Sequence, residues 1–233
     1  MKSIFYYNKN MALIQLSNII KTYPDGENKR KSVLKGVSMD VQKGDFVAIT
    51  GASGSGKTTL LSILGTLLFP DSGSYLLDGK DMLASGIDLS AVRNRNIGFV
   101  FQEHRLMPQY TVLDNILLPT LACQSKAENE QIEYAVRLME LTGITSVAAQ
   151  YPQTISGGEA NRTALCRSLI MKPLLLLADE PTGQLDSDNS RNIVALFSRI
   201  NKELGTTIVM VTHSEDVSAA ANSILTIKNG VLQ

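Results

Sequence analysis

The chain has 233 residues, of which 44% are hydrophobic and 19% are charged, a composition typical of a soluble globular protein. This length allows one large domain or two small ones, with a sizeable core. Lysine plus arginine equals aspartate plus glutamate, at 22 each, so there is no overall basic field that would point to nucleic acid.

The cysteines and the apolar segments indicate the compartment. Cys123 and Cys166 have neither metal-binding spacing nor a disulfide framework, which fits a reducing environment. No stretch approaches the about 18 consecutive apolar residues that span a bilayer. The apolar segment at the amino terminus is too short for a signal peptide. We therefore expect a cytosolic chain whose membrane role, if any, requires a partner subunit.

The first third of the chain is expected to be rich in β-structure. Residues 12–20 form a strand-like run, and a turn-rich stretch follows it. Residues 33–41 and 44–49 continue the pattern, and residues 71–81 place a short strand between turn signals. These patterns predict an antiparallel β region that leads into a single domain over residues 12–233, with residues 1–11 as a flexible extension.

A glycine-dense stretch, TGASGSGKTT, covers residues 50–59. It follows an apolar run that is typical of a buried strand, and Leu60, Leu64, Leu67 and Leu68 follow it at helical spacing. The stretch matches G-x-x-x-x-G-K-[ST], the P-loop, with Gly51, Gly56, Lys57 and Thr58 in the fixed positions.

The residue types in this P-loop suit a nucleotide phosphate. Glycines let backbone N–H groups approach phosphate oxygens closely, and the following helix directs its positive end at the anion. Lys57 would reach the β- and γ-phosphates, and the Thr58 hydroxyl would be a ligand for Mg²⁺. The alternative is a flexible loop with a helix cap.

The middle of the chain changes to helical periodicity. Residues 127–143 predict a helix that ends at Gly143. Its expected inward face consists of Ile132, Ala135, Val136 and Met139. We expect a mostly helical insertion over roughly residues 95–166.

Buried parallel strands are predicted near the carboxyl terminus. Residues 173–180 (PLLLLADE) and 206–213 (TTIVMVTH) are continuous apolar runs, as expected for strands covered on both faces. An amphipathic helix separates them, with Ile193, Phe197, Ile200 and Leu204 directed inward. The predicted fold class is α/β, a P-loop NTPase core with a parallel sheet.

Two carboxylates follow the first of these strands. Asp179 and Glu180 lie at its carboxyl end, where ligand sites of open α/β sheets occur. Asp179 is placed to help hold Mg²⁺, and Glu180 could orient or deprotonate an attacking water. Alone, the pair would be an ordinary acidic junction between a strand and a loop.

The segment TISGGEANR allows two readings that do not exclude each other. Ser156 and Glu159 fit a capping box at the start of a helix. Gly157 and Gly158, at the same helix amino terminus, also make an anion site. We call Ser156, Gly157, Gly158 and Glu159 the signature segment.

With the strand LLLLADEPTGQLD that follows, the signature segment resembles the signature motif and Walker B of ABC-type ATPases. The likeness covers almost the whole chain and implies the ABC ATPase fold, with bound ATP and Mg²⁺. It implies that Tyr23 stacks on adenine, that Gln102 is the Q-loop glutamine and a metal ligand, that Asp186 is the D-loop aspartate, and that His213 is the switch histidine. The nucleotide-binding set that it implies also includes Ser53, Gly54, Ser55 and Thr59. His104 receives no chemical role.

Within the family, the segment HRLMPQYTVLDNILLP is most similar to the ATPase subunits of lipoprotein-releasing and macrolide-export transporters. There are departures: Ile155 stands where leucine is usual, Ala160 and Asn161 replace a polar or basic pair, GQLD replaces GNLD, and Thr58 replaces serine. None of them removes a catalytic group.

The resemblance implies a head-to-tail dimer in which the signature segment completes the site of a second copy. Catalysis would be positioning and charge stabilisation by Lys57, Glu180, His213 and Gln102. Residues 102–119 would contact a membrane permease, at the inner face of the cell membrane. Two alternatives remain: an ATPase of a non-transporting membrane complex, and a soluble ABC-type ATPase.

Overall fold

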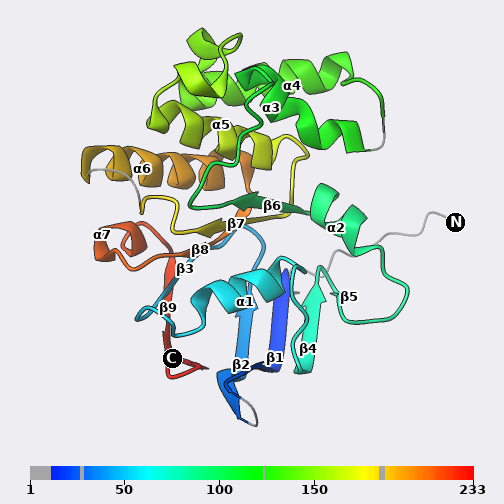
Figure 1. Ribbon diagram of the computed structural model, residues 1–233, viewed down its shortest axis with the longest axis vertical. Helices are drawn as coiled ribbons and strands as arrows, with labels where there is room; N and C mark the ends of the chain where they lie inside the picture. Colours follow the sequence, from blue (N-terminus) through cyan, green and yellow to red (C-terminus); the bar gives the residue numbers. More distant parts are fainter. Residues whose placement is uncertain (1–11, 27–28, 123, 184–186) are drawn as a thin grey trace, which may run out of the picture.

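The computed structural model describes residues 12–233, apart from residues 27–28, 123 and 184–186. It has an antiparallel sheet, a mainly parallel sheet and a group of helices on the far side of the parallel sheet (Figure 1). Within the described residues, no helix is both long enough and apolar enough to cross a bilayer.

The amino-terminal sheet confirms the predicted antiparallel β region. Its four strands lie in the order β2-β1-β4-β5, and every pairing is antiparallel. Their bounds are β1 Ile14–Pro24, β2 Arg30–Val41, β4 Ser72–Leu77 and β5 Lys80–Asp81.

The second sheet carries the predicted parallel core. Its six strands lie in the order β10-β9-β3-β8-β7-β6, and all pairs are parallel except β10 with β9. Their bounds are β3 Phe46–Thr50, β6 Ile97–Val100, β7 Leu175–Asp179, β8 Thr207–Val211, β9 Ser223–Lys228 and β10 Val231–Leu232. The runs predicted as buried strands are β7 and β8, and every residue of β8 is buried.

Helices connect and cover these strands. Helix α1 (Lys57–Leu64) follows β3, α2 (Leu89–Arg95) precedes β6, and α6 (Ser187–Leu204) joins β7 to β8. A short α7 (Glu215–Ser218) follows β8. Between β6 and β7 lie α3 (Val112–Leu117), α4 (Asn129–Thr142), α5 (Gly157–Leu169) and the short 3-10 helices η1 (Leu118–Ala122), η2 (Thr145–Val147) and η3 (Pro152–Thr154). The helical insertion expected over residues 95–166 thus overlaps β6 at its start and ends within α5. The division of the chain into an extension and one domain stays a prediction.

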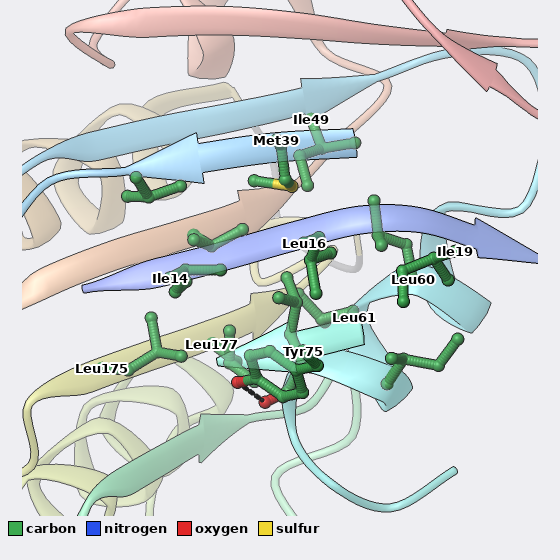
Figure 2. Packing of buried hydrophobic residues seen from close by; sticks show 14 of the residues in the cluster. Ile14, Leu16, Ile19, Met39, Ile49, Leu60, Leu61, Tyr75, Leu175 and Leu177 are labelled. Atoms are coloured by element: carbon green, nitrogen blue, oxygen red, sulfur yellow. Dashed lines mark hydrogen bonds between the residues drawn. The ribbon is translucent and has the colours of Figure 1, made fainter. Parts of the chain in front are cut away.

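Alternate residues of the parallel strands build two cores. Leu175 and Leu177 of β7 face α1 and the antiparallel sheet, as Figure 2 shows. Leu176 and Ala178 face α6 and the helices between β6 and β7. In the first core the Tyr75 hydroxyl donates to the Leu64 carbonyl at 2.7 Å, so this buried polar group is satisfied (Figure 2).

Three residues predicted to face inward are exposed, and the helix after the P-loop is shorter than the spacing of its leucines predicts. Ile132 and Val136 of α4 are exposed, because the helix turns Ala135, Leu138 and Met139 into the core instead. Leu204, at the end of α6, is also exposed. Helix α1 ends at Leu64, so Leu67 lies outside it and is 52% exposed.

Candidate functional site

The P-loop connects the carboxyl end of β3 to the amino end of α1. Gly51 has φ 144 and Gly56, the N-cap of α1, has φ 108. A Cβ on Gly51 would lie 2.4 Å from the carbonyl oxygen of Ile227, and one on Gly56 would lie 2.9 Å from a methyl of Leu34. Glycine is therefore required at both positions, and the amino end of α1 stays open to an anion.

Lys57 and Ser55 carry polar groups that suit a phosphate ligand. The buried Lys57 ammonium donates to the carbonyl oxygens of Gly51 at 2.8 Å and Ala52 at 3.0 Å. The Ser55 hydroxyl is buried and has no hydrogen-bond partner within the described residues. A polyphosphate in the loop would supply a counter-charge for Lys57 and a partner for Ser55, so these residues fit the expected nucleotide. Ser53 and Gly54 lie in the turn between β3 and α1, and Thr58 and Thr59 lie in the first turn of α1.

Thr58 and Asp179 come together from α1 and β7. The Thr58 hydroxyl donates to Oδ1 of Asp179 across 3.4 Å. Burial raises the pKa of Asp179, and so does the charge of Glu180, while the Thr58 hydrogen bond and the charge of Lys57 lower it. A carboxylate beside a hydroxyl is an oxygen donor set that suits Mg²⁺, and a bound cation would favour the charged form of Asp179.

Glu180 and His213 face each other from the ends of the neighbouring strands β7 and β8. Nδ1 of His213 lies 2.8 Å from Oε2 of Glu180, a buried oxygen that accepts no well-aligned hydrogen bond from the described residues. Glu180 has φ 47, and its N–H donates to the Val211 carbonyl at 3.0 Å. A non-glycine residue held in this left-handed conformation is a feature of functional sites. The backbone that carries the carboxylate is thereby held in place, and His213 is exposed at the surface.

Gln102 reaches the same edge of the sheet from the segment after β6. Its side chain is exposed, and Nε2 lies 3.1 Å from the position that a Cβ on Gly183 would take. Gly183 follows Glu180 and donates its N–H to the Glu180 carbonyl at 3.0 Å. The structure therefore brings Gln102 next to the loop that carries Glu180.

The signature segment forms the amino end of α5. Ser156 is the N-cap, and the predicted capping box is present. The Glu159 carboxylate accepts from the N–H and the hydroxyl of Ser156 at 2.8 and 2.7 Å. Among the described residues, no hydrogen bond joins the signature segment to the P-loop.

Tyr23 lies near the end of β1, with 38% of its surface exposed and the Lys21 ammonium 5.9 Å from its ring centre. A cleft of about 710 Å³ runs beside the P-loop and is lined by residues of β2, the P-loop and the β9–β10 turn. Tyr23 does not line this cleft itself, but it pairs across the β1–β2 ladder with Lys31, which does. Asp186 lies outside the described residues.

Sequence reasoning missed Asn115, a fully buried residue in α3. Its side chain accepts from the Met107 N–H at 2.8 Å and donates to the carbonyls of Met107, Tyr110 and Thr111. It therefore fixes the loop that follows Gln102. The available signal was a single amide in the apolar run VLDNILL.

A P-loop at the carboxyl edge of a parallel sheet, with carboxylates at the ends of neighbouring strands, defines a P-loop ATPase. The profile of the ABC transporter family matches residues 34–183, more than half of the chain. The chain belongs to this family and is an ATPase that binds ATP.

Individual relatives and solved structures support the same family assignment. The chain is 41% identical to the lipoprotein-releasing system ATP-binding protein LolD of Shewanella frigidimarina, over 95% of this chain and 92% of that one. It is 42% identical to the macrolide export ATP-binding/permease protein MacB of Rhodopirellula baltica, over 94% of this chain but only 32% of that protein. The chain thus spans about a third of the MacB relatives.

A dimeric post-hydrolysis structure of the ATP-binding cassette MJ0796, bound to ADP and phosphate, superposes with a TM-score of 0.84 at 34% identity, covering 94% of this chain and 96% of that one. The structure of CbiO1 from Clostridium perfringens, part of the transporter complex CbiONQ, gives 0.85 at 28% identity, over 96% and 88% of the two chains. The ABC ATPase fold and the family inferred from the motifs are confirmed.

Proposed function

We propose that this chain is the ATP-hydrolysing subunit of an assembly in which two copies drive a separate membrane permease. The observation that carries the proposal is the convergence of Lys57, the Thr58–Asp179 pair and the Glu180–His213 pair at one edge of the parallel sheet. These groups come from the P-loop, α1 and the ends of β7 and β8, and together they suit a nucleotide triphosphate and an attacking water.

The roles of the residues follow from their chemistry. Lys57 and the loop N–H groups would bind the phosphates, and the hydroxyl of Thr58, the carboxylate of Asp179 and the amide oxygen of Gln102 would hold Mg²⁺. Bound there, Mg²⁺ would neutralise the charge of the phosphate oxygens. Glu180 orients the attacking water and takes its proton, and His213, 2.8 Å away, positions Glu180 and contacts the γ-phosphate.

A second copy completes the site. The signature segment forms a capped helix end that makes no hydrogen bond to the P-loop of its own chain within the described residues. The dimeric structures of the cassette MJ0796 support a head-to-tail arrangement, in which Ser156, Gly157 and Gly158 bind the γ-phosphate of the partner's ATP. Tyr23 and Asp186 would complete the nucleotide site at the adenine and at the dimer contact.

The permease would dock beside the segment that follows Gln102. A groove of about 560 Å³ lies there, with Phe99, Phe101, Leu118 and Pro119 among its lining residues. The names of the LolD and MacB relatives favour export or extraction of a lipoprotein, peptide or drug-like substrate. The chain would then sit at the inner face of the cell membrane, held by its permease.

Two other functions use the same ATPase. It could drive a mechanical signal in a cell-division or signalling complex, or it could act in solution. The likeness to LolD over 92% of that protein's length favours the permease-coupled function.

The experiment is an affinity purification of the Glu180→Gln chain with ATP from detergent-solubilised native membranes, with Lys57→Ala as a control that lacks nucleotide binding. We expect a multi-span permease to co-purify at a defined ratio with Glu180→Gln, and its extracytoplasmic domain to indicate the cargo. Recovery of soluble or ribosomal partners alone would overturn the permease proposal and leave the ATPase assignment intact. Light scattering of the purified variant tests the dimer separately: we expect a dimer with ATP and a monomer without it.

A further inference from the structure

Arg167 links the signature helix to the segment that follows Gln102. It lies in the last turn of α5, and its guanidinium donates to the carbonyl of His104 at 2.7 Å and to that of Arg105 at 2.8 Å. A planar guanidinium presents its N–H donors in a rigid fork, so it loses less side-chain freedom than an ammonium does when it holds two neighbouring acceptors. Two consecutive backbone carbonyls are thus fixed to the same helix whose other end carries the signature segment.

The backbone that Arg167 holds has an unusual conformation. Arg105 has φ 47, in the left-handed region that non-glycine residues rarely adopt. Its guanidinium lies 4.8 Å from the Phe101 ring centre, and Phe101 stacks on Phe99 of β6 at 5.4 Å. Such a conformation persists only where surrounding contacts determine it, and the two bonds from Arg167 are contacts of that kind.

His104 makes a second connection to the same helix. Its Nδ1 is buried without a hydrogen-bond partner in the described part of the chain. Burial lowers the pKa of His104, the nearby Asn161 side chain raises it and the charge of Arg167 lowers it, so the ring lies close to α5, where Asn161 is itself buried. Two adjacent residues of the segment are therefore held by one helix.

We propose that Arg167 is a positioning residue that makes the segment after Gln102 and the signature segment move as one body. The proposal rests on the proposed function, in which Gln102 serves the chain's own ATP and Ser156 serves the partner's. Arg105 and Arg167 also line the groove of about 560 Å³ beside Phe101. An occupant of this groove would therefore contact the arginine that joins the two segments.

The test is a distance measurement between spin labels at Glu103 and Gln153, which are exposed at the two ends of the proposed body. Cys123 is replaced by serine, whereas Cys166 is buried, with the pKa of its thiol raised to about 12, and will not react with the label. The variants are Arg167→Gln and Arg167→Lys, with Arg137→Gln on the exposed face of α4 as the matched control. Glu140 and Lys202 carry a second label pair that monitors the rest of the fold.

We expect Arg167→Gln to broaden the Glu103–Gln153 distance distribution and to lower kcat about tenfold, as for lost hydrogen bonds of ordinary strength, with the KM for ATP unchanged. Arg167→Lys should be intermediate, and Arg137→Gln should match the wild type. An unchanged distribution and kcat in Arg167→Gln would overturn the proposal. So would equal broadening of the Glu140–Lys202 pair with a loss of ATP affinity, since that indicates a merely structural role. The distances are measured without nucleotide, so they do not depend on the proposed function. If Arg167→Gln does not fold, the distance distribution of Arg167→Lys is compared with that of the wild type instead.

Discussion

The two helix amino termini of the site differ in how their N–H groups are satisfied. Helix α1 begins at Gly56 with no side-chain cap and no acidic residue in its first turn, and Lys57 adds a positive charge. Helix α5 begins at Ser156 with a complete capping box, in which Glu159 supplies a carboxylate. The amino end of α1 has no anionic side chain, whereas the amino end of α5 has the carboxylate of Glu159.

This difference gives the two ends different dependence on ligand. At the amino end of α1, the positive end of the helix dipole lies beside the buried Lys57 ammonium. An anion from outside the chain is therefore needed to balance this positive charge. The end of α5 is stable without ligand, because the Ser156 N–H and hydroxyl already bond to Glu159. A preformed, self-satisfied helix end is suited to being presented to a second molecule at little cost in ordering. Changes at α1 should therefore act on nucleotide binding, and changes at α5 on association.

Glu180→Gln should give the largest effect, because it removes the proposed base beside an otherwise intact α1 site. We expect turnover to fall by roughly 100-fold or more, as for loss of a general base, with ATP affinity retained. Phosphate release at saturating ATP measures turnover, and isothermal titration measures affinity. Glu140→Gln, on the exposed face of α4, should behave as the wild type. Rapid hydrolysis by Glu180→Gln would remove Glu180 from its assigned role.

Lys57→Ala tests the open end of α1 directly. Loss of the ammonium removes charge-assisted bonds to the phosphates, each of about 1.5–3 kcal/mol, so ATP affinity should fall by roughly 100-fold. The fold should persist, because within the described residues the side-chain bonds lost are only those to the carbonyls of Gly51 and Ala52. Titration calorimetry with ATP checks this, with the exposed Lys202→Ala as the control. Equal affinity in Lys57→Ala and wild type would contradict the contrast between the two ends.

Local sequence patterns predicted much of this site, and for a physical reason. A glycine that needs φ 144 and a Ser-x-x-Glu capping box are properties of a few consecutive residues, so Gly51 and Ser156 could be identified in the sequence. The roles of Gln102 and His213 came instead from the family resemblance. Strands β7 and β8 were predictable because burial on both faces makes them continuously apolar.

What could not be predicted depends on contacts between distant segments. The exposure of Ile132 and Val136 depends on how α4 rotates against its neighbours, which its own periodicity does not decide. Arg167 binds carbonyls 62 and 63 residues earlier in the chain. No pattern within α5 distinguishes that arginine from a solvent-exposed one.

Ser156→Ala tests the self-satisfied end of α5. Removing the hydroxyl takes away the acceptor for the Glu159 N–H, which should cost about 1 kcal/mol of stability, as for other N-cap residues. ATP affinity of the single chain should be unchanged, whereas the ATP-dependent dimer of the Glu180→Gln background should weaken. Denaturant unfolding and light scattering measure the two effects. Ser90→Ala, in the first turn of α2, is the control for a helix-end serine that is not the N-cap. A loss of ATP affinity in Ser156→Ala would show that α5 serves its own P-loop after all.

The smallest effect concerns the pH dependence of the capping box. Hydrogen bonds from the hydroxyl and the N–H of Ser156 lower the pKa of Glu159 below its ordinary value. A carboxyl whose pKa is lowered by folding contributes stability above its unfolded pKa, and this contribution is lost as the pH falls through the folded pKa. The difference in unfolding free energy between wild type and Glu159→Gln should therefore be constant near neutral pH and shrink below about pH 4, the ordinary range of a glutamate. Because Glu159 is partly exposed to solvent, the change should be a few tenths of a kcal/mol and should diminish in high salt. Urea unfolding of both proteins at pH 7, 5 and 3.5 measures it, and a difference that grows as the pH falls would mean that the carboxylate is not the group that closes this helix end.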